Sequence, residues 1–411
     1  MKFFILSLLS LYSLSITAKE FIIQVDHIKN FSGIEKLQPL RTKNIHLLKF
    51  KGSLNDLQAI IGSNKSVIKI EENISLKLFS HSDSNDSLFK QQWHLENTGL
   101  NSRTTVIVPG IKGEDIDAKR AWEISTGSEE IKVALIDTGV DYTGIDLKES
   151  IWINQMEMNG SPGVDDDENG YIDDIYGYDF INQDNDPIDE DGHGSHCAGI
   201  IGATHGNGGI KGVMSKVKIM ALKFSTGGAG TMEAALEAID YAIEKGAHIM
   251  SNSWGGAPAE SILFDLLKKA SEKGIFIVNA AGNSGNNSDR FPIYPASYDF
   301  PGNMSIGATM GRGSKANFSN YGKTKVDVFA PGQNIYSTWI NGKYKKKSGT
   351  SMAAPIVAGM AGLALSLSPD LSPEELKELI IYTSENLSAL KDKAVGGRVN
   401  AFNLLNEVLQ R

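Results

Sequence analysis

The sequence predicts an α/β protein: a doubly wound, mostly parallel sheet with helices on both faces, preceded by a small α+β unit. Short, nearly continuous apolar runs recur along the chain, and several alternate with stretches of helical periodicity. Apolar strands that alternate with helices are typical of parallel sheets covered on both sides. A polar stretch at residues 80–87 separates an N-terminal segment from this larger pattern.

The composition fits a globular protein without disulfides. The chain has 411 residues, 41% of them hydrophobic, which is enough to bury a large core. Cys197 is the single cysteine, so no intramolecular disulfide can form. The formal net charge is −9, and residues 149–210 contain no Lys or Arg but many Asp and Glu residues. This balance argues against a nucleic-acid partner.

The N-terminus has the pattern of a secretory signal peptide. Residues 1–18 carry Lys2, then an apolar run that ends at Ala18. A membrane anchor is the alternative, but the run is short for a membrane span. We therefore expect cleavage after Ala18, a secreted (extracellular or periplasmic) product, no membrane association after cleavage, and a monomer.

Residues 19–80 predict a small α+β unit. Strand-like segments at 21–25, 45–50 and 66–70 alternate with helix-like segments at 34–37 and 54–61. The polar residues that follow suit an exposed linker that proteases can reach. The predicted domains are therefore 1–18, 19–80, a cleavable linker at 81–90, and one large domain at 91–411.

The large domain begins with a predicted helix at 117–124 and a strand at 131–136 that ends at Asp137. Further strands are predicted at 217–222, 248–250, 275–278, 303–306 and 326–329, and further helices at 232–245 and 261–273. Two more helices, rich in small residues, are expected to start near His193 and Ser351. In such sheets, functional sites form at the carboxyl ends of the strands.

Three polar residues stand at predicted strand or helix ends: Asp137, His193 and Ser351. Each residue alone fits a purely structural role, since Asp is common in turns and Ser is a common helix cap. We place Pro355 in the first turn of the helix after Ser351, where its missing N–H needs no partner. The free N–H groups at that helix start would stabilise developing negative charge beside the serine.

The contexts of these residues resemble the signature blocks of the subtilases, the subtilisin family of serine endopeptidases. The blocks are residues 134–141 (ALIDTGVD), 193–199 (HGSHCAG) and 349–355 (GTSMAAP), and they follow the order Asp, His, Ser that is known for subtilisin. The resemblance runs from about residue 91 to residue 401. It implies a subtilisin-like catalytic domain at 91–411. It also implies that residues 19–80 are a propeptide that inhibits the enzyme until the zymogen processes itself.

The resemblance also implies roles for individual residues. Ser351 would be the nucleophile, His193 the general base, and Asp137 the group that orients His193. Asn283, in residues 279–285 (NAAGNSG), would donate a hydrogen bond to the oxyanion. Extended protein or peptide substrates would pair with residues 251–256, with an apolar preference beside the cleaved bond. The implied substrate-binding residues are Ser251, Ser253, Trp254, Gly255, Ala281 and Gly282.

Residues 165–174 (DDDENGYIDD) have the start of a calcium-binding loop. The twelfth position is Tyr176 instead of Glu, so a full EF-hand is not supported. We predict structural Ca²⁺ here, with a solvated acidic loop as the alternative. The predicted ligands are Asp165, Asp167, Asn169, Tyr171 through its carbonyl, and Asp173. The resemblance adds Asp146 as a ligand of a second site, although residues 204–210 lack the ligand pattern that the family has there.

Two residues of the block that starts at His193, Cys197 and His196, and two alternative functions have separate interpretations. Cys197 follows His193 by four residues and is predicted to be a packed neighbour of the site, not a nucleophile. His196 is predicted to be structural. A catalytically silent, calcium-binding module is the alternative function, and the three intact blocks argue against it. A nucleotide site is disfavoured, because residues 206–209 lack the required glycine spacing and follow a helix.

Overall fold

The structure is a computed structural model that describes residues 19–25, 36–39, 45–50, 53–61, 67–72, 85–102, 109–256 and 258–411. The chain divides into two compact units, Met1–Ser82 and Asp83–Arg411. The predicted signal peptide at residues 1–18 lies outside the described residues. The division into propeptide, linker and catalytic domain stays a prediction.

The described part of the first unit is an antiparallel sheet in the order β2-β3-β1-β4. Its elements are β1 Lys19–Val25, β2 Lys36–Pro39, β3 Ile45–Phe50, α1 Leu54–Ile61 and β4 Val67–Glu72. The helix predicted at 34–37 is wrong at residues 36 and 37, because Lys36–Pro39 is a strand that pairs with β3; residues 34 and 35 lie outside the described residues. A helix of one turn gains few hydrogen bonds, whereas a sheet edge offers a ready-made partner for the backbone.

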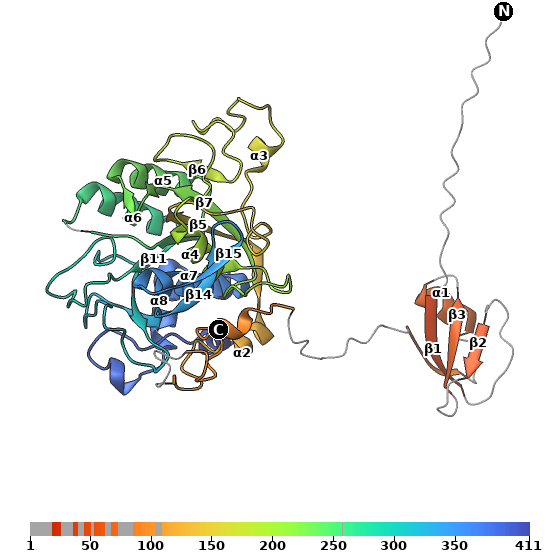
Figure 1. Cartoon of the computed structure of the whole chain (residues 1–411). Coiled ribbons are helices and arrows are strands. Elements are labelled where there is room, and N and C mark those ends of the chain that lie inside the picture. The colour runs from red at the N-terminus through yellow and green to blue at the C-terminus, as the bar shows by residue number, and fades with distance from the viewer. Residues whose placement is uncertain are drawn as a thin grey trace, which may run out of the picture. The chain divides into compact units, whose positions relative to one another are not determined.

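The second unit is organised around a seven-stranded sheet in the order β13-β12-β11-β10-β5-β7-β6 (Figure 1). Every neighbouring pair in it is parallel. The strands are β5 Gly127–Asp137, β6 Gly177–Asp179, β7 Lys216–Lys223, β10 Ile249–Asn252, β11 Phe276–Ala280, β12 Asn303–Thr309 and β13 Val328–Pro331. The predicted parallel sheet is confirmed.

Helices lie on both faces of this sheet. They are α2 Ala118–Ile124, α3 Gln155–Met158, α4 His193–Gly202, α5 Met232–Glu244, α6 Ser261–Glu272, α7 Thr350–Leu367, α8 Pro373–Tyr382 and α9 Ala401–Val408, with short 3₁₀ helices at Phe89–Gln91 and Ser388–Leu390. Two hairpins complete the unit: β8 Ser225–Thr226 with β9 Ala229–Gly230, and β14 Ile335–Trp339 with β15 Lys343–Lys347.

The side chains of β5 show why both faces are covered. Val133 and Leu135 belong to one core cluster, which also contains residues of α4 and α7. Ala134 and Ile136 belong to a second cluster, with residues of α5 and α6. Successive side chains of a strand point to opposite faces, so an apolar run on a central strand requires a helix layer on each side.

The prediction for Pro355 is wrong. α7 begins at Thr350, so this proline lies inside the helix and not in its first turn. A proline there cannot bond to the carbonyl four residues earlier, which belongs to Ser351. Other groups bind that carbonyl instead: Ser253 Oγ donates to it at 3.0 Å and Cys197 Sγ at 3.3 Å. The missing helical hydrogen bond is thereby replaced by contacts from two other segments.

α7 is apolar along its whole length. Among the described residues it is the one helix that is long and apolar enough to cross a membrane, and 89% of it is buried inside the unit. Its apolar composition is explained by this burial, because its residues pack between the central strands and α4.

Candidate active site

Asp137 and His193 meet at the carboxyl edge of the sheet. Asp137 is the last residue of β5 and His193 is the first residue of α4. Nδ1 of His193 lies 2.7 Å from Oδ1 of Asp137, so the ring donates this proton to the carboxylate, which can only accept. The negative charge of Asp137 raises the pKa of His193, against the lowering effect of burial.

A buried aspartate that the sequence analysis missed holds these two segments together. Asp189 accepts hydrogen bonds from the backbone N–H groups of Asp191, Gly192 and Ser195 and from the hydroxyl of Ser195. It also accepts the hydroxyl of Thr138, the residue after Asp137, at 2.9 Å. One carboxylate thus joins the end of β5 to the start of α4. The sequence offered one signal for this role, the position of Asp189 four residues before His193.

Ser351 lies in the first turn of α7 and is 9% exposed. Its Oγ donates to the carbonyl of Ser253 at 3.2 Å. Cys197 connects it to the other two residues, because Cys197 Sγ contacts the Ser351 carbonyl and lies within 4.8 Å of a ring nitrogen of His193 and a carboxylate oxygen of Asp137. The structure therefore brings the three predicted catalytic residues into one region.

Asn283 is fixed beside the serine. Its Oδ1 accepts the backbone N–H of Thr350 at 2.8 Å and the hydroxyl of Thr350 at 3.0 Å. A Cβ placed on Gly349 would lie 3.4 Å from Nδ2 of Asn283 and 3.6 Å from the N of Ser351. These two N–H donors therefore flank the same point next to the serine. The start of a helix leaves the Ser351 N–H without an acceptor four residues earlier in the helix.

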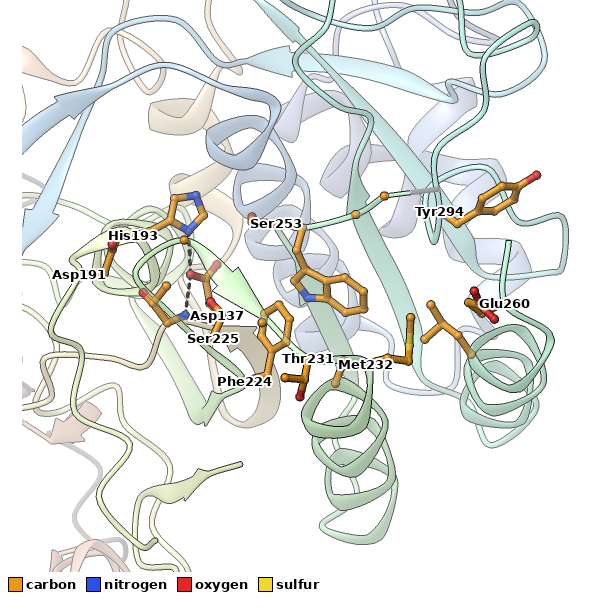
Figure 2. A pocket seen from close by; sticks show the side chains of 18 of the residues that line it. Asp137, Asp191, His193, Phe224, Ser225, Thr231, Met232, Ser253, Glu260 and Tyr294 are labelled. Atoms are coloured by element: carbon orange, nitrogen blue, oxygen red, sulfur yellow. Dashed lines mark hydrogen bonds and ion pairs between the residues drawn. The ribbon is translucent and has the colours of Figure 1, made fainter. Parts of the chain in front are cut away.

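A pocket of about 520 Å³ opens beside His193. Figure 2 shows His193 and Asp137 joined by a dashed line at one side of this pocket, with Phe224 and Met232 farther along and Tyr294 at the opposite side. Its lining residues include Asp137, His193, Phe224, Gly230, Met232, Ala235, Ser253, Trp254, Gly255, Glu260, Leu263 and Tyr294. The sequence analysis missed the contribution of residues 224–235, which run from the end of β7 through β8 and β9 to the start of α5.

The predicted substrate-binding residues divide into two groups. Ser253, Trp254 and Gly255 line the pocket, and the Trp254 ring packs against Phe224 at a centroid distance of 5.0 Å. Ser251 does not line it and is fully buried at the end of β10.

Ala281 and Gly282 also lie outside the pocket lining. The carbonyl of Ala281 accepts from Asn320 Nδ2 at 2.9 Å. Gly282 adopts φ +102°, and a Cβ there would come within 2.4 Å of Ile293 Cδ1. This positive φ favours glycine, and the space next to Gly282 is already occupied by other side chains.

The other residues near the site have structural environments. Burial raises the pKa of the Cys197 thiol well above its ordinary value, which keeps it protonated and a poor nucleophile. Burial also lowers the pKa of His196 to about 3, and its Nε2 bonds to the carbonyls of Ile335 and Lys345. These environments agree with the predicted packing roles of both residues.

Three carboxylates converge in the predicted calcium loop. Glu157, Asp165 and Asp167 each offer an oxygen, and these oxygens lie within 4.8 Å of one another. Oδ1 of Asp167 is buried and has no hydrogen-bond partner among the described residues. The sequence analysis missed Glu157, which comes from α3, before the loop. This donor set fits a calcium ion, which prefers carboxylate and carbonyl oxygens.

Two of the other predicted ligands of the loop accept backbone hydrogen bonds, as the oxygens of Glu157 and Asp165 also do. Asn169 Oδ1 accepts the N–H of Tyr171 at 2.6 Å, and Asp173 accepts the N–H of Gly163 at 2.8 Å. The Tyr171 ring packs against Tyr241, with centroids 5.4 Å apart.

Lys245, just after α5, reaches into this loop from outside its sequence. Its Nζ forms an ion pair with Oδ2 of Asp167 and lies 3.8 Å from Oδ2 of Asp174. The loop itself contains no basic residue. A residue distant in sequence therefore neutralises part of the negative charge of the loop, so a bound ion would need to neutralise less of it.

Asp146 lies apart from the carboxylate cluster of the loop. Its Oδ2 accepts the hydroxyl of Tyr344 at 2.6 Å, while its Oδ1 is buried without a partner among the described residues. Asn207 and the charge of Asp86 also act on this carboxyl, whose pKa is raised mainly by burial. Asp146 is therefore not part of the loop cluster, and its assignment to a second calcium site stays a prediction.

Comparisons with known proteins agree with this geometry. The profile of the subtilase family matches residues 128–401. Thermitase from Thermoactinomyces vulgaris is 35% identical over 291 residues, which cover 70% of this chain and 93% of thermitase. Subtilisin DY from Bacillus licheniformis is 32% identical and matches 68% of this chain and 91% of its own length.

Two further matches extend the comparison. Subtilisin-like protease 1 from Plasmodium berghei is 32% identical over 84% of this chain, but the match spans only 59% of that longer protein. A solved structure of a protease from Pseudoalteromonas arctica covers 80% of this chain with a TM-score of 0.63 and 24% identity, which shows the shared fold. The family profile covers most of the chain, and the matched relatives are proteases. The chain belongs to the subtilase family of serine endopeptidases.

Proposed function

We propose that this protein is a secreted serine endopeptidase that cleaves extended polypeptides through an acyl-enzyme, with Ser351, His193 and Asp137 as its catalytic triad. The observation that carries the proposal is the hydrogen bond between His193 and Asp137 at the edge of the pocket. Ser253 also lines this pocket, and its carbonyl accepts a hydrogen bond from Ser351 Oγ. Family membership supports peptide-bond hydrolysis.

The proposed reaction has two stages, formation of an acyl-enzyme and its hydrolysis. Ser351 Oγ attacks the carbonyl carbon while its proton moves to Nε2 of His193, and Asp137 stabilises the imidazolium through Nδ1–H. The tetrahedral oxyanion is stabilised by the Asn283 side chain and the Ser351 N–H. His193 then gives its proton to the leaving amine as the C–N bond breaks. Water, activated by His193, hydrolyses the acyl-enzyme.

The substitution Ser351→Ala tests this proposal together with self-processing. The wild type should lose residues 19–80 and react with a serine-directed phosphonate, whereas the variant should stay full length and unlabelled. Ser366→Ala, a serine at the other end of α7, is the matched control and should process normally. An unlabelled wild type would disprove the enzyme proposal, and a processed Ser351→Ala variant would disprove self-processing.

We also propose that the protein is exported and that residues 19–80 inhibit it before cleavage. The apolar run before Ala18 supports export, and the polar residues 80–87 support a cleavable connection. Purified residues 19–80, added to the mature enzyme, should inhibit peptide cleavage. Mass spectrometry of the secreted product should locate both cleavage sites.

We propose structural Ca²⁺ at the cluster of Glu157, Asp165 and Asp167. The orphaned, buried Oδ1 of Asp167 supports this site. Asp146, with its own unpartnered oxygen and the nearby Asp86 and Asn207, is a second candidate position. Calcium would neutralise the carboxylates and brace the loops, and no catalytic step needs it.

A further inference from the structure

The strand β15 carries an unusual density of positive charge for an acidic protein. Four of its five residues are lysines, at positions 343, 345, 346 and 347. Among the described residues, none of these four amines has an acidic partner within 4.0 Å, and the amines of Lys345 and Lys347 lie over an aromatic ring. Unpaired like charges repel each other, so this strand is suited to bind a negatively charged group.

The hairpin of β14 and β15 is fixed against α4, the helix that begins at His193. Nε2 of the buried His196 bonds to the carbonyls of Ile335, in β14, and Lys345, in β15, at 3.1 and 3.0 Å. In return, Ser337 Oγ donates to the carbonyl of His196 at 2.8 Å, and Thr338 Oγ1 donates to that of Ser195 at 2.6 Å. The backbone of β15 therefore holds a defined position relative to His193.

Trp339 places two of these lysines close to the candidate site. The amines of Lys345 and Lys347 lie 4.3 and 5.2 Å from the centre of its ring. The same ring rests on Gly192, where a Cβ would approach it to 2.4 Å, and Gly192 directly precedes His193. The charge of Lys347 also acts on His193, whose pKa it lowers against the larger effect of Asp137.

The lysines lie outside the pocket. Its lining includes His193 and residues 253–256 but no residue of β14 or β15. In the proposed function, the part of the substrate before the cleaved bond pairs with residues 251–256. An extended substrate that continues past Ser351 then leaves along a different surface. β15 leads into Ser351 after only three residues, so it borders that surface.

We propose that Lys345, Lys347 and Trp339 form a subsite for the leaving part of the substrate, which selects peptides with carboxylate side chains in the first residues after the cleaved bond. This inference rests on the proposed function. An exposed ion pair contributes little, so each lysine should change the preference by about two- to fivefold. Salt should weaken the preference, because the Debye length is only about 8–10 Å near physiological ionic strength.

The test uses quenched fluorescent peptides that share one sequence before the bond. They differ in the second and third residues after it, which are Ala-Ala, Asp-Glu or Lys-Lys. kcat/KM is measured at low salt, at a pH where His193 is neutral, for the wild type, for Lys345→Gln with Lys347→Gln, and for Lys273→Gln. Lys273 is an exposed lysine just after α6 and serves as the matched control.

The wild type and Lys273→Gln should prefer Asp-Glu over Ala-Ala by about four- to tenfold, and the double variant should lose most of this preference. High salt should have the same effect on the wild type. An acidic residue placed three positions before the bond should give no lysine-dependent preference. The subsite proposal is overturned if the double variant loses kcat/KM equally on all three peptides, or if it keeps the preference of the wild type. If the wild type cleaves Ala-Ala without any preference, the proposed function stands and only the subsite fails; if it cleaves none of the peptides, both fail.

Discussion

At the scale of single residues, the candidate site depends on hydrogen bonds that orient the side chains proposed to act in catalysis. Asp137 fixes the ring of His193 through Nδ1, and Thr350 fixes Asn283 through two hydrogen bonds to Oδ1. A fixed amide oxygen leaves the amide nitrogen of Asn283 free to donate. Such preorganised donors stabilise developing charge without reorganising during the reaction, which is why they contribute strongly to catalysis.

The pH dependence of activity should reflect His193. The general base must be neutral, and Asp137 raises the pKa of His193 above its ordinary value, so activity should fall as the pH drops through that raised pKa. Asp137→Asn should move this acidic limb to lower pH and reduce kcat by as much as about 10⁴-fold. A pH profile of kcat/KM for both proteins checks this. An unmoved limb would mean that another group controls it.

Loss of the side-chain donor should affect turnover more than binding. Asn283→Ala should lower kcat by about 10²–10³-fold with little change in KM, a magnitude taken from subtilisin itself. Steady-state kinetics on one peptide substrate measures both constants. Asn286→Ala, in the same loop, is the control and should retain activity. A rise in KM at unchanged kcat would assign Asn283 to substrate binding instead.

At the scale of elements, connections between segments position the catalytic groups. Asp189 joins the end of β5 to the start of α4 through five hydrogen bonds. Pro355 breaks the internal bonding of α7, and the freed carbonyl of Ser351 is bound by residues from β10's end and from α4. The proposed nucleophile, Ser351, is therefore held through its own backbone by both neighbouring segments.

Asp189→Asn should impair both stability and turnover. The new amide N–H₂ would face N–H groups that need an acceptor, and leaving buried donors unpaired costs about 1–3 kcal/mol each. We expect a melting temperature lower by several degrees and a kcat reduced at least tenfold, with a shifted His193 pH profile. Glu190→Gln, on an exposed side chain of the same loop, is the control. A stability loss with normal kcat and pH profile would limit Asp189 to a structural role.

At the scale of the whole molecule, the acidic loop is held from several directions. Glu157 reaches it from α3 and Lys245 from the end of α5. Without any disulfide among its residues, the chain depends on packing, ion pairs and proposed bound ions for stability.

Removal of calcium should lower the melting temperature. At a free calcium concentration of about 100 times Kd, one bound ion stabilises the fold by about 2.7 kcal/mol. For a unit of this size, that corresponds to a shift of about 4 °C on adding a chelator. Glu157→Gln should reduce the shift, whereas Glu168→Gln, on an exposed loop position, should not. Calorimetry measures all three shifts, and an unchanged wild type would exclude a stabilising ion.

The sequence by itself determined that apolar strands alternate with helices, that the sheet is parallel, and which family the chain belongs to. These follow from patterns that lie within a few residues of each other, such as the apolar run before Asp137 and the blocks around His193 and Ser351. Only the tertiary structure decided that β2 is a strand, that Pro355 lies inside α7, and that Glu157 and Lys245 join the acidic loop. Each of these depends on a partner from a distant part of the chain, and local periodicity carries no information about such a partner.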